Sequence, residues 1–179
     1  MNFDIIGLSG YAQSGKDSVA EVLVNEYGYT RLAFADKIRE LLLAVDPRLS
    51  DGFKLNFLIR SSGWDSVKVR YPEVRKMLQD VGIAGRELLG PRVWIDGVFD
   101  NVVPGERYVI TDVRFKNEAA ELSFYGGRLW RVERPGVGPV NAHISETDVI
   151  NAPVDQTIVN GGTLEDLKAL IKTRMAYAH

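Results

Sequence analysis

The chain has 179 residues, of which 45% are hydrophobic and 26% charged, and its formal net charge is −2. This size and composition are typical of one globular domain, and the balanced charge gives no bulk attraction to nucleic acid or to an anionic membrane. Because the sequence contains no cysteine, disulfides and thiolate chemistry are excluded. We expect no nucleic-acid partner, no membrane partner and a cytoplasmic location, which for a viral chain is the host cytoplasm.

The first apolar run, residues 3–8, has the length and β-branched content of a strand buried in a parallel sheet. A loop follows in which Gly10, four residues and the pair Gly15-Lys16 fit the P-loop pattern. In such a loop, backbone N–H groups converge on phosphate oxygens, and the lysine reaches the β- and γ-phosphates of a nucleoside triphosphate. A predicted helix over residues 16–27 completes the required context. The predicted phosphate-binding loop and first helical turn contain Gly10, Ser14, Gly15, Lys16, Asp17 and Ser18.

The residue after Lys16 is usually a serine or threonine that ligates magnesium, but here it is Asp17, with Ser18 next. Either Ser18 takes over that role, or Asp17 helps to hold a hydrated Mg²⁺, which keeps several waters and takes one or two carboxylates. We therefore predict Asp17 and Ser18 as the metal residues. A strand-to-helix turn without any ligand is the structural alternative.

Residues 29–34 predict a second short strand, and Asp36 is a candidate N-cap for a helix that ends at Asp46-Pro47. Residues 48–71 mix short apolar pieces with glycine and polar residues, which predicts a loop with helical turns.

Pro72 is typical of a first helical position, and an apolar stripe follows it. We expect Gly82 and Gly85 to interrupt this helix, with further helical pieces over residues 86–89 and 93–99. The sequence therefore predicts a helical insert over residues 36–99.

Residues 107–112 form an apolar strand that ends in Asp112. This is similar to a Walker B arrangement, in which the carboxylate serves the phosphate-bound metal or the reacting group. Alternatively, Asp112 caps the helix predicted over residues 117–125, and the two roles can coexist.

A further strand over residues 128–133 is followed by Arg134, Pro135 and Gly136, and we predict a lid-like loop over residues 134–155. His143 in that loop is either a catalytic base or a structural hydrogen-bonding residue. A last strand is predicted over residues 157–160, and Thr163 with Asp166 predicts a capped final helix.

About five strands alternating with helices predict a single α/β domain over residues 1–179, with three layers and a mostly parallel sheet, as in P-loop kinases. In such sheets the ligand lies at the carboxyl ends of the strands. The P-loop, Asp112 and the segment after Glu133 all fall at that edge.

With these residues placed, the chain resembles the bacteriophage-type deoxynucleoside monophosphate kinases of the P-loop nucleotide kinase group. The resemblance runs nearly end to end, except between Val45 and Tyr71, where no motif matches. It is carried by residues 8–17, 35–39, 75–82, 94, 111–114, 118, 134–136, 143–146 and 158–165.

The resemblance implies transfer of the ATP γ-phosphoryl group to a deoxynucleoside monophosphate (dNMP), giving the diphosphate and ADP, with ATP and Mg²⁺ bound. By matching positions, it implies catalytic roles for Lys16, Asp112, Arg114 and Arg134. The acceptor would be bound by Asp36, Lys37, Arg75, Gly82, Trp94, Asp112, Arg114 and Glu118. The sequence also leaves room for a homodimer.

Several of these residues have structural alternatives: Trp94 suits core packing, Arg75 suits a solvated helix face, and Arg114 suits a salt bridge. Two other functions remain open. One is another P-loop small-molecule kinase, of the dephospho-coenzyme A type, and the other is a nucleotide-binding regulatory module that hydrolyses slowly. Such a module needs a residue that orients water, and Gln13 is the nearby candidate.

Overall fold

The computed structural model describes residues 3–139, 148–150 and 152–176. In chain order the elements are β1 (Asp4–Ser9), α1 (Lys16–Tyr27), β2 (Thr30–Leu32), α2 (Phe34–Val45), α3 (Leu55–Arg70), α4 (Pro72–Leu89), α5 (Val93–Phe99), β3 (Arg107–Ile110), α6 (Lys116–Phe124), β4 (Arg128–Glu133), β5 (Gln156–Val159) and α7 (Leu164–Ala176).

The chain divides into two compact units. We call Met1–Ala33 together with Val98–His179 the core unit, and Phe34–Gly97 the helical unit. The core unit contains the sheet, whereas α2, α3 and α4 belong to the helical unit.

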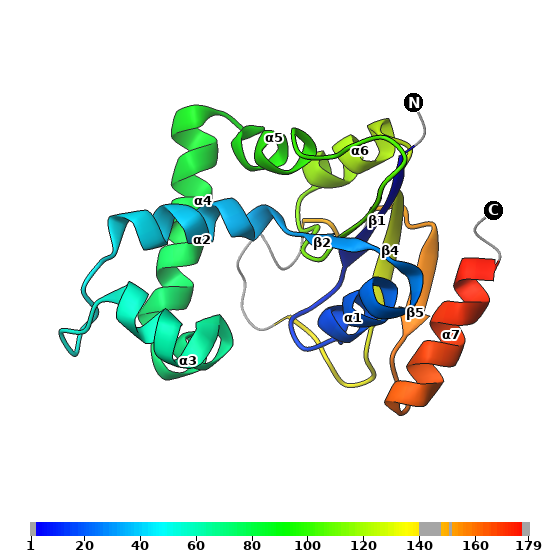
Figure 1. The fold of residues 1–179 in the computed structure, drawn as a ribbon, viewed down its shortest axis with the longest axis horizontal. Coiled ribbons are helices and arrows are strands. Elements are labelled where there is room, and N and C mark those ends of the chain that lie inside the picture. The colour runs from blue at the N-terminus through cyan, green and yellow to red at the C-terminus, as the bar shows by residue number, and fades with distance from the viewer. Residues whose placement is uncertain (1–2, 140–147, 151, 177–179) are drawn as a thin grey trace. The chain divides into compact units, whose positions relative to one another are not determined.

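The core unit is built on one five-stranded sheet with the order β2-β3-β1-β4-β5. Every strand pair is parallel, so all carboxyl ends lie at the same edge. Helices α1 and α7 cover one face of the sheet and α6 covers the other (Figure 1). The predicted three-layer α/β fold with a parallel sheet is therefore confirmed.

Strand β1 lies in the middle of the sheet and is buried on both faces. Leu8 is fully buried in the cluster that the sheet forms with α1 and α7. On the other face, Gly7 leaves room for Leu122 of α6, because a Cβ at Gly7 would lie 2.5 Å from Leu122 Cδ2. This two-sided burial makes β1 a rigid base for the loop that follows it.

The amino ends of the strands are joined by a polar network. The Asp4 carboxylate accepts hydrogen bonds from the Tyr29 hydroxyl at 2.8 Å and from Arg128 Nη2 at 2.7 Å. Arg107 Nε lies 3.3 Å from the second Asp4 oxygen. Burial and the hydrogen bond to Asp4 raise the pKa of Tyr29, so this phenol stays protonated at neutral pH.

In the helical unit, residues 48–71 differ from the prediction, because most of them form helix α3 instead of a loop. Leu55, Leu58 and Val67 are buried in a cluster that includes Val74 of α4. Gly63 interrupts the helix with φ 74° and ψ 165°. This kink breaks the helical periodicity of the apolar residues, which explains why the sequence pattern pointed to a loop.

Helix α4 also differs from the prediction, since Gly82 and Gly85 do not interrupt it. Both glycines make room for neighbouring side chains. A Cβ at Gly85 would lie 2.3 Å from Trp94 Cζ2, and the Trp94 indole N–H donates to the Gly82 carbonyl at 2.9 Å. Packing against Trp94 therefore outweighs the low helix propensity of glycine here.

The predicted N-cap role of Asp36 is wrong, because α2 already begins at Phe34. The helix starts three residues before the position that capping by Asp36 would give, and its first residue, Phe34, has a buried side chain. Asp36 lies in the first turn, where a carboxylate interacts favourably with the helix dipole.

The two ends of the core unit's chain agree better with the sequence pattern. Helix α1 spans the predicted residues and ends at Gly28, which adopts φ 70°. At the start of α7, the Thr163 backbone N–H and hydroxyl both donate to the Asp166 carboxylate, at 2.8 and 2.7 Å. The predicted cap of the last helix is therefore confirmed.

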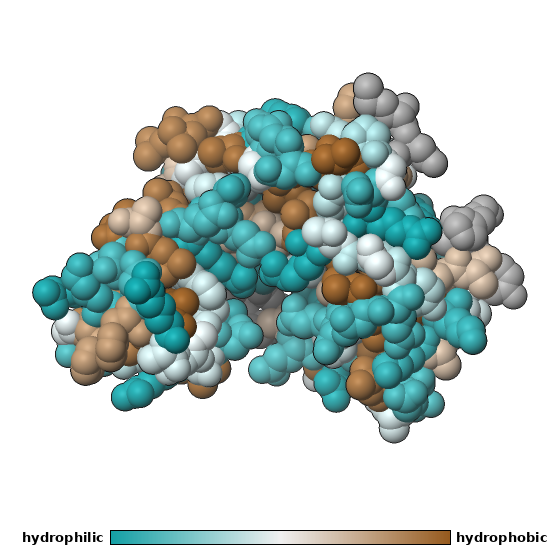
Figure 2. Space-filling view, viewed as in Figure 1, coloured by the Kyte–Doolittle hydropathy of each residue, from teal (hydrophilic) through white to brown (hydrophobic). Residues whose placement is uncertain are grey.

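Hydrophilic side chains cover much of the face shown in Figure 2, and apolar side chains reach the surface between them. Two exposed aromatic residues of the helical unit, Phe53 and Phe57, stack with ring centroids 5.6 Å apart. Among the described residues, no helix combines the length and the apolar character that crossing a membrane requires.

Gly85→Ala tests the packing of Trp94 in α4. Alanine improves helix propensity by about 1 kcal/mol, but the forced shift of the indole costs more, so we expect a net loss of about 1 to 2 kcal/mol in the free energy of unfolding. Urea unfolding followed by circular dichroism measures this difference. Gly82→Ala is the control and should cost less, because the added Cβ would lie 3.2 Å from the end of the Ile38 side chain. A stabilised Gly85→Ala protein would contradict the packing argument.

Candidate functional site

The loop between β1 and α1 packs tightly against β4, and two glycines make this approach possible. Gly10 adopts φ +135°, and a Cβ there would lie 2.2 Å from the Val132 carbonyl oxygen. Gly15 adopts φ +99° at the N-cap of α1. Side-chain-bearing residues rarely adopt either conformation, so the loop backbone requires glycine at both positions.

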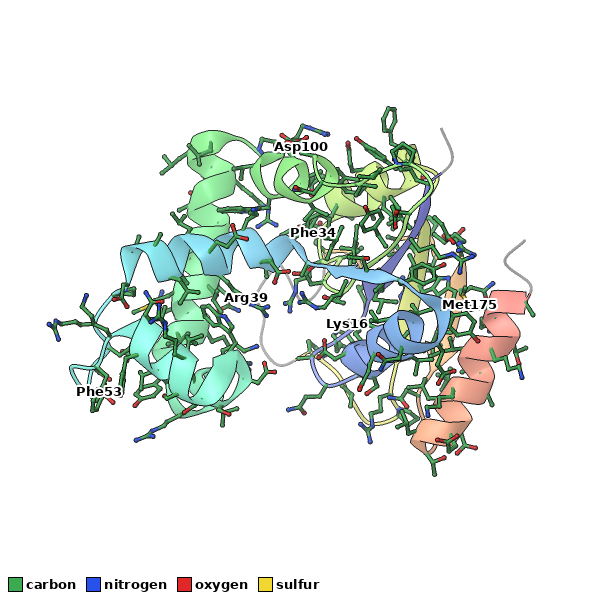
Figure 3. The ribbon with its side chains drawn as sticks, viewed as in Figure 1. Lys16, Phe34, Arg39, Phe53, Asp100 and Met175 are labelled. Carbon is green, nitrogen blue, oxygen red and sulfur yellow. The ribbon has the colours of Figure 1, made fainter. Side chains whose placement is uncertain are left out.

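Lys16 begins α1 and folds back over the loop (Figure 3). Its Nζ donates to the carbonyl oxygens of Gly10 at 2.8 Å and Tyr11 at 2.7 Å. These two hydrogen bonds hold the ammonium group at the mouth of the loop. An anion with several oxygens offers this lysine stronger, charge-assisted hydrogen bonds.

Ser14 supplies an independent sign that the loop suits an anionic ligand. Its side chain is 1% exposed, and its hydroxyl finds no hydrogen-bond partner among the described residues. A buried hydroxyl without a partner is costly, and a phosphate oxygen is a suitable acceptor for it. The loop also leads directly into the N-terminus of α1, where the helix dipole favours negative charge.

Asp17 and Ser18, the predicted metal residues, lie in the first turn of α1, where Asp17 is exposed and Ser18 half-buried. Within the described residues, no three acidic or histidine side chains gather as a ready-made metal site. Two oxygen ligands fit a magnesium ion that keeps most of its waters and shares the phosphates of a nucleotide.

Asp112 and Arg114 lie at the same edge of the sheet as the loop. The backbone extends the strand pairing beyond β3, because Thr111 N–H donates to Leu32 O at 3.0 Å and Val113 N–H donates to Leu8 O at 3.0 Å. These bonds fix Asp112 and Arg114 beside the carboxyl end of β1. The sequence-based placement of both residues at this edge is therefore correct.

Glu118 is 1% exposed and acts on the backbone just before α6. Its Oε2 accepts hydrogen bonds from the N–H groups of Arg114 at 2.8 Å and Phe115 at 3.0 Å. The helix begins at Lys116 with Phe115 as its N-cap residue, so the alternative in which Asp112 caps this helix is wrong. In this structure Glu118 holds the segment that carries Arg114, and direct substrate contact by Glu118 stays a prediction.

Arg134 directly follows β4, and its exposed side chain lines a pocket of about 320 Å³. Gly10, Tyr11 and Ser14 of the loop line the same pocket, together with Arg131, Pro135 and Val159 among others. Of the predicted lid, residues 134–139 have no helix or strand, whereas His143 lies outside the described residues. We call residues 10–15, the loop between β1 and α1, the phosphate loop. The pocket therefore adjoins the phosphate loop on the side of β4 and β5.

The helical unit carries the other predicted acceptor residues, and three of them are polar side chains on helices. Asp36 accepts a hydrogen bond from Arg39 at 3.0 Å, and Lys37 donates to Glu40 at 2.9 Å. Arg75 is exposed on α4 and makes no hydrogen bond or ion pair with the described part of the chain. Of these three side chains, that of Arg75 is the most available to an anionic ligand.

Gly82 and Trp94 form one packed pair inside the helical unit. Trp94 is 5% exposed and donates its indole N–H to Gly82. The structural alternative, core packing, describes Trp94 as it stands here, because its buried indole ring lies against Gly85. Contact of Trp94 with the acceptor stays a prediction.

Sequence reasoning missed one residue that touches the phosphate loop. Asn160, immediately after β5, donates from Nδ2 to the Ser14 carbonyl at 3.1 Å. The available signal was its place at a strand's carboxyl end before Gly161 and Gly162, at the edge where the loop lies.

No family model matches this chain. Two viral proteins are similar in sequence. A protein of Acanthamoeba polyphaga mimivirus, named "Putative deoxynucleotide monophosphate kinase", is 30% identical over 191 residues, covering 93% of each chain. An uncharacterised protein, ORF76 of Ictalurid herpesvirus 1 (strain Auburn), is 26% identical, covering 93% of this chain and 65% of that protein.

Solved structures of distant sequence are also similar. The structure of TT1252 from Thermus thermophilus has a TM-score of 0.48 at 19% identity, covering 100% of both chains. Dephospho-CoA kinase from Campylobacter jejuni has a TM-score of 0.48 at 14% identity, covering 97% of this chain and 96% of that one. Such values are too low to inform on substrate, so the assignment rests on the mimivirus protein, which matches this chain along nearly its whole length. The chain belongs to the deoxynucleotide monophosphate kinase family.

Proposed function

We propose that this protein transfers the γ-phosphoryl group of ATP to a dNMP, giving the deoxynucleoside diphosphate and ADP. The observation that carries this proposal is the loop before α1, where Lys16 Nζ lies on the carbonyls of Gly10 and Tyr11 and the buried Ser14 hydroxyl has no hydrogen-bond partner among the described residues. The name of the mimivirus relative supports a deoxynucleotide monophosphate as the acceptor.

On the donor side, the loop N–H groups and Lys16 hold the β- and γ-phosphates. The lysine exchanges the carbonyls of Gly10 and Tyr11 for phosphate oxygens, and the Ser14 hydroxyl gains an acceptor. The pocket beside the loop, lined by Arg131 and Val159, offers room for the nucleoside part of the donor. Each of these contacts positions the donor without forming a covalent bond.

In the reaction, an oxygen of the dNMP phosphate forms a bond to the γ-phosphorus, and the bond from that phosphorus to the β–γ bridging oxygen breaks. The attacking oxygen is already anionic, so no general base is required. Arg114, held at the strand edge, can bind the acceptor phosphate through two parallel N–H groups. Arg134 can add positive charge at the transferring group, where negative charge is redistributed.

Magnesium, when bound, neutralises charge on the donor phosphates. Asp17 and Ser18 are the residues that we propose hold it, and Asp112 at the adjacent strand end supplies a further carboxylate. In the helical unit, Arg75 is the strongest acceptor candidate because its guanidinium is exposed. Asp36 and Lys37 remain proposed acceptor residues on α2.

Lys16→Met should reduce turnover at least about 100-fold while the protein stays folded, because the lysine supplies charge to the phosphates rather than core packing. A coupled assay of ADP release measures turnover, and circular dichroism melting checks the fold. Lys172→Met on the exposed face of α7 is the matched control and should behave like wild type. A folded Lys16→Met protein with near-native activity would rule out the donor site.

An ADP-release assay across a panel of monophosphates tests the acceptor. We expect more than one dNMP to be phosphorylated and the ribonucleotides to be poor substrates, as the family membership suggests. Dephospho-coenzyme A and a reaction without acceptor belong in the same panel, since they test the small-molecule kinase and the slow hydrolase. Equal phosphorylation of AMP or UMP and the best dNMP would show that the substrate assignment is wrong.

Arg114→Ala and Arg134→Ala should have different kinetic effects. Arg114 is fixed by strand pairing and by Glu118, which suits a phosphate bound before and after the reaction, so its loss should raise the KM for dNMP about 10- to 100-fold. Arg134 follows β4 in an exposed segment, and its loss should lower kcat about 100-fold with less change in KM.

Steady-state kinetics with each substrate varied in turn separates these effects. Arg48→Ala, an exposed arginine outside the predicted site, is the control. If Arg134→Ala changes only the KM for dNMP and Arg114→Ala changes only kcat, the two roles are reversed. If neither variant changes either constant, both arginines lie outside the working site.

A further inference from the structure

Asn160 joins three segments that meet at the carboxyl edge of the core sheet. Its side-chain Nδ2 donates to the Ser14 carbonyl of the phosphate loop at 3.1 Å, across 146 positions of sequence. Its backbone N–H donates to the Glu133 carbonyl at 2.7 Å, directly before Arg134. The residue therefore ties the loop to the ends of β4 and β5.

The loop backbone approaches the Asn160 amide so closely that only glycine fits at position 15. A Cβ on Gly15 would lie 2.1 Å from Asn160 Nδ2 and 3.2 Å from its Cγ. Glycine is thus required at position 15 for two reasons, the close contact with Asn160 and the φ of +99°. This contact is built into the fold and does not arise from two surface groups that happen to meet.

We propose that Asn160 is a positioning residue that holds the phosphate loop in its ligand-binding shape. The Ser14–Gly15 peptide is planar, so its carbonyl and its N–H point in opposite directions. Because Asn160 holds the Ser14 carbonyl on its own side, the Gly15 N–H is aimed away from Asn160 and is available to a phosphate oxygen. This inference depends on the proposed donor site, but not on the identity of the acceptor.

Two variants remove the donor in different ways. Asn160→Leu keeps a similar branched shape but has no amide group to donate a hydrogen bond. Asn160→Asp places a carboxylate oxygen against the Ser14 carbonyl. Both keep the backbone N–H that bonds to Glu133. Asn25→Asp, on the exposed face of α1, is the matched control for the change from amide to carboxylate.

ATP binding, measured by calorimetry without any acceptor, is the first readout. We expect about 3- to 10-fold weaker binding in Asn160→Leu, which is the effect of one neutral hydrogen bond, and a larger loss in Asn160→Asp. Asn25→Asp should bind as wild type does. In steady-state kinetics the KM for ATP should rise in the Asn160 variants while the KM for dNMP stays within about 2-fold.

Hydrogen exchange without nucleotide is the second readout, because it separates positioning from general stability. In Asn160→Leu, exchange should become faster in the peptide spanning residues 10–18 and stay unchanged in peptides from α6 and α7. Faster exchange throughout the core unit would assign Asn160 a purely structural role and overturn the proposal. Unchanged ATP affinity in Asn160→Leu would also overturn it.

The two proposals can fail separately. If Lys16→Met loses ATP binding but both Asn160 variants keep it, the donor site stands and the role of Asn160 is wrong. If the Asn160 variants weaken ATP binding but wild type phosphorylates no dNMP, the positioning role stands and the acceptor assignment is wrong. If wild type does not bind ATP at all, both proposals are wrong.

Discussion

The site depends on how closely the loop after β1 can approach its neighbours. At Gly10 the limit is a carbonyl oxygen of β4, and at Gly15 it is the side-chain amide of Asn160. Any side chain at either position would push the loop away from the sheet. The loop conformation is therefore set by contacts with strands far away in the sequence, and the rigid burial of β1 makes those contacts reproducible.

The phosphate loop was readable from the sequence because its signal is local: an apolar strand, two glycines at fixed spacing, a lysine and a helix. The same holds for Asp112 and Arg114, since a strand end followed by charged residues is a short pattern. Residues that work through distant contacts were not readable. Nothing near Asn160 in sequence indicates its contact with Ser14, which lies 146 positions away. Glu118 is different, because its partners Arg114 and Phe115 lie only four and three positions before it, and a glutamate at that spacing is a local capping signal.

The errors in α3 and α4 share one physical cause. Glycine is a poor helix former, so Gly82 and Gly85 suggested breaks, and Gly63 obscured the periodicity of α3. Tertiary packing decided otherwise in α4, where the missing Cβ of Gly85 admits Trp94. Local propensity cannot distinguish a glycine that ends a helix from one that makes room for a neighbouring side chain. At Gly28, propensity and tertiary structure agree, and the predicted helix end was correct.

The two edges of the sheet differ in how completely their polar groups are paired. At the amino ends, Asp4, Tyr29, Arg107 and Arg128 satisfy one another, whereas at the carboxyl ends Ser14 keeps a buried hydroxyl without a partner among the described residues. The polar groups at the amino edge are thus paired with one another, whereas the carboxyl edge has a buried hydroxyl that can still accept a partner. We therefore expect substitutions at the amino edge to change mainly the free energy of unfolding, and substitutions at the carboxyl edge to change mainly the affinity for a ligand.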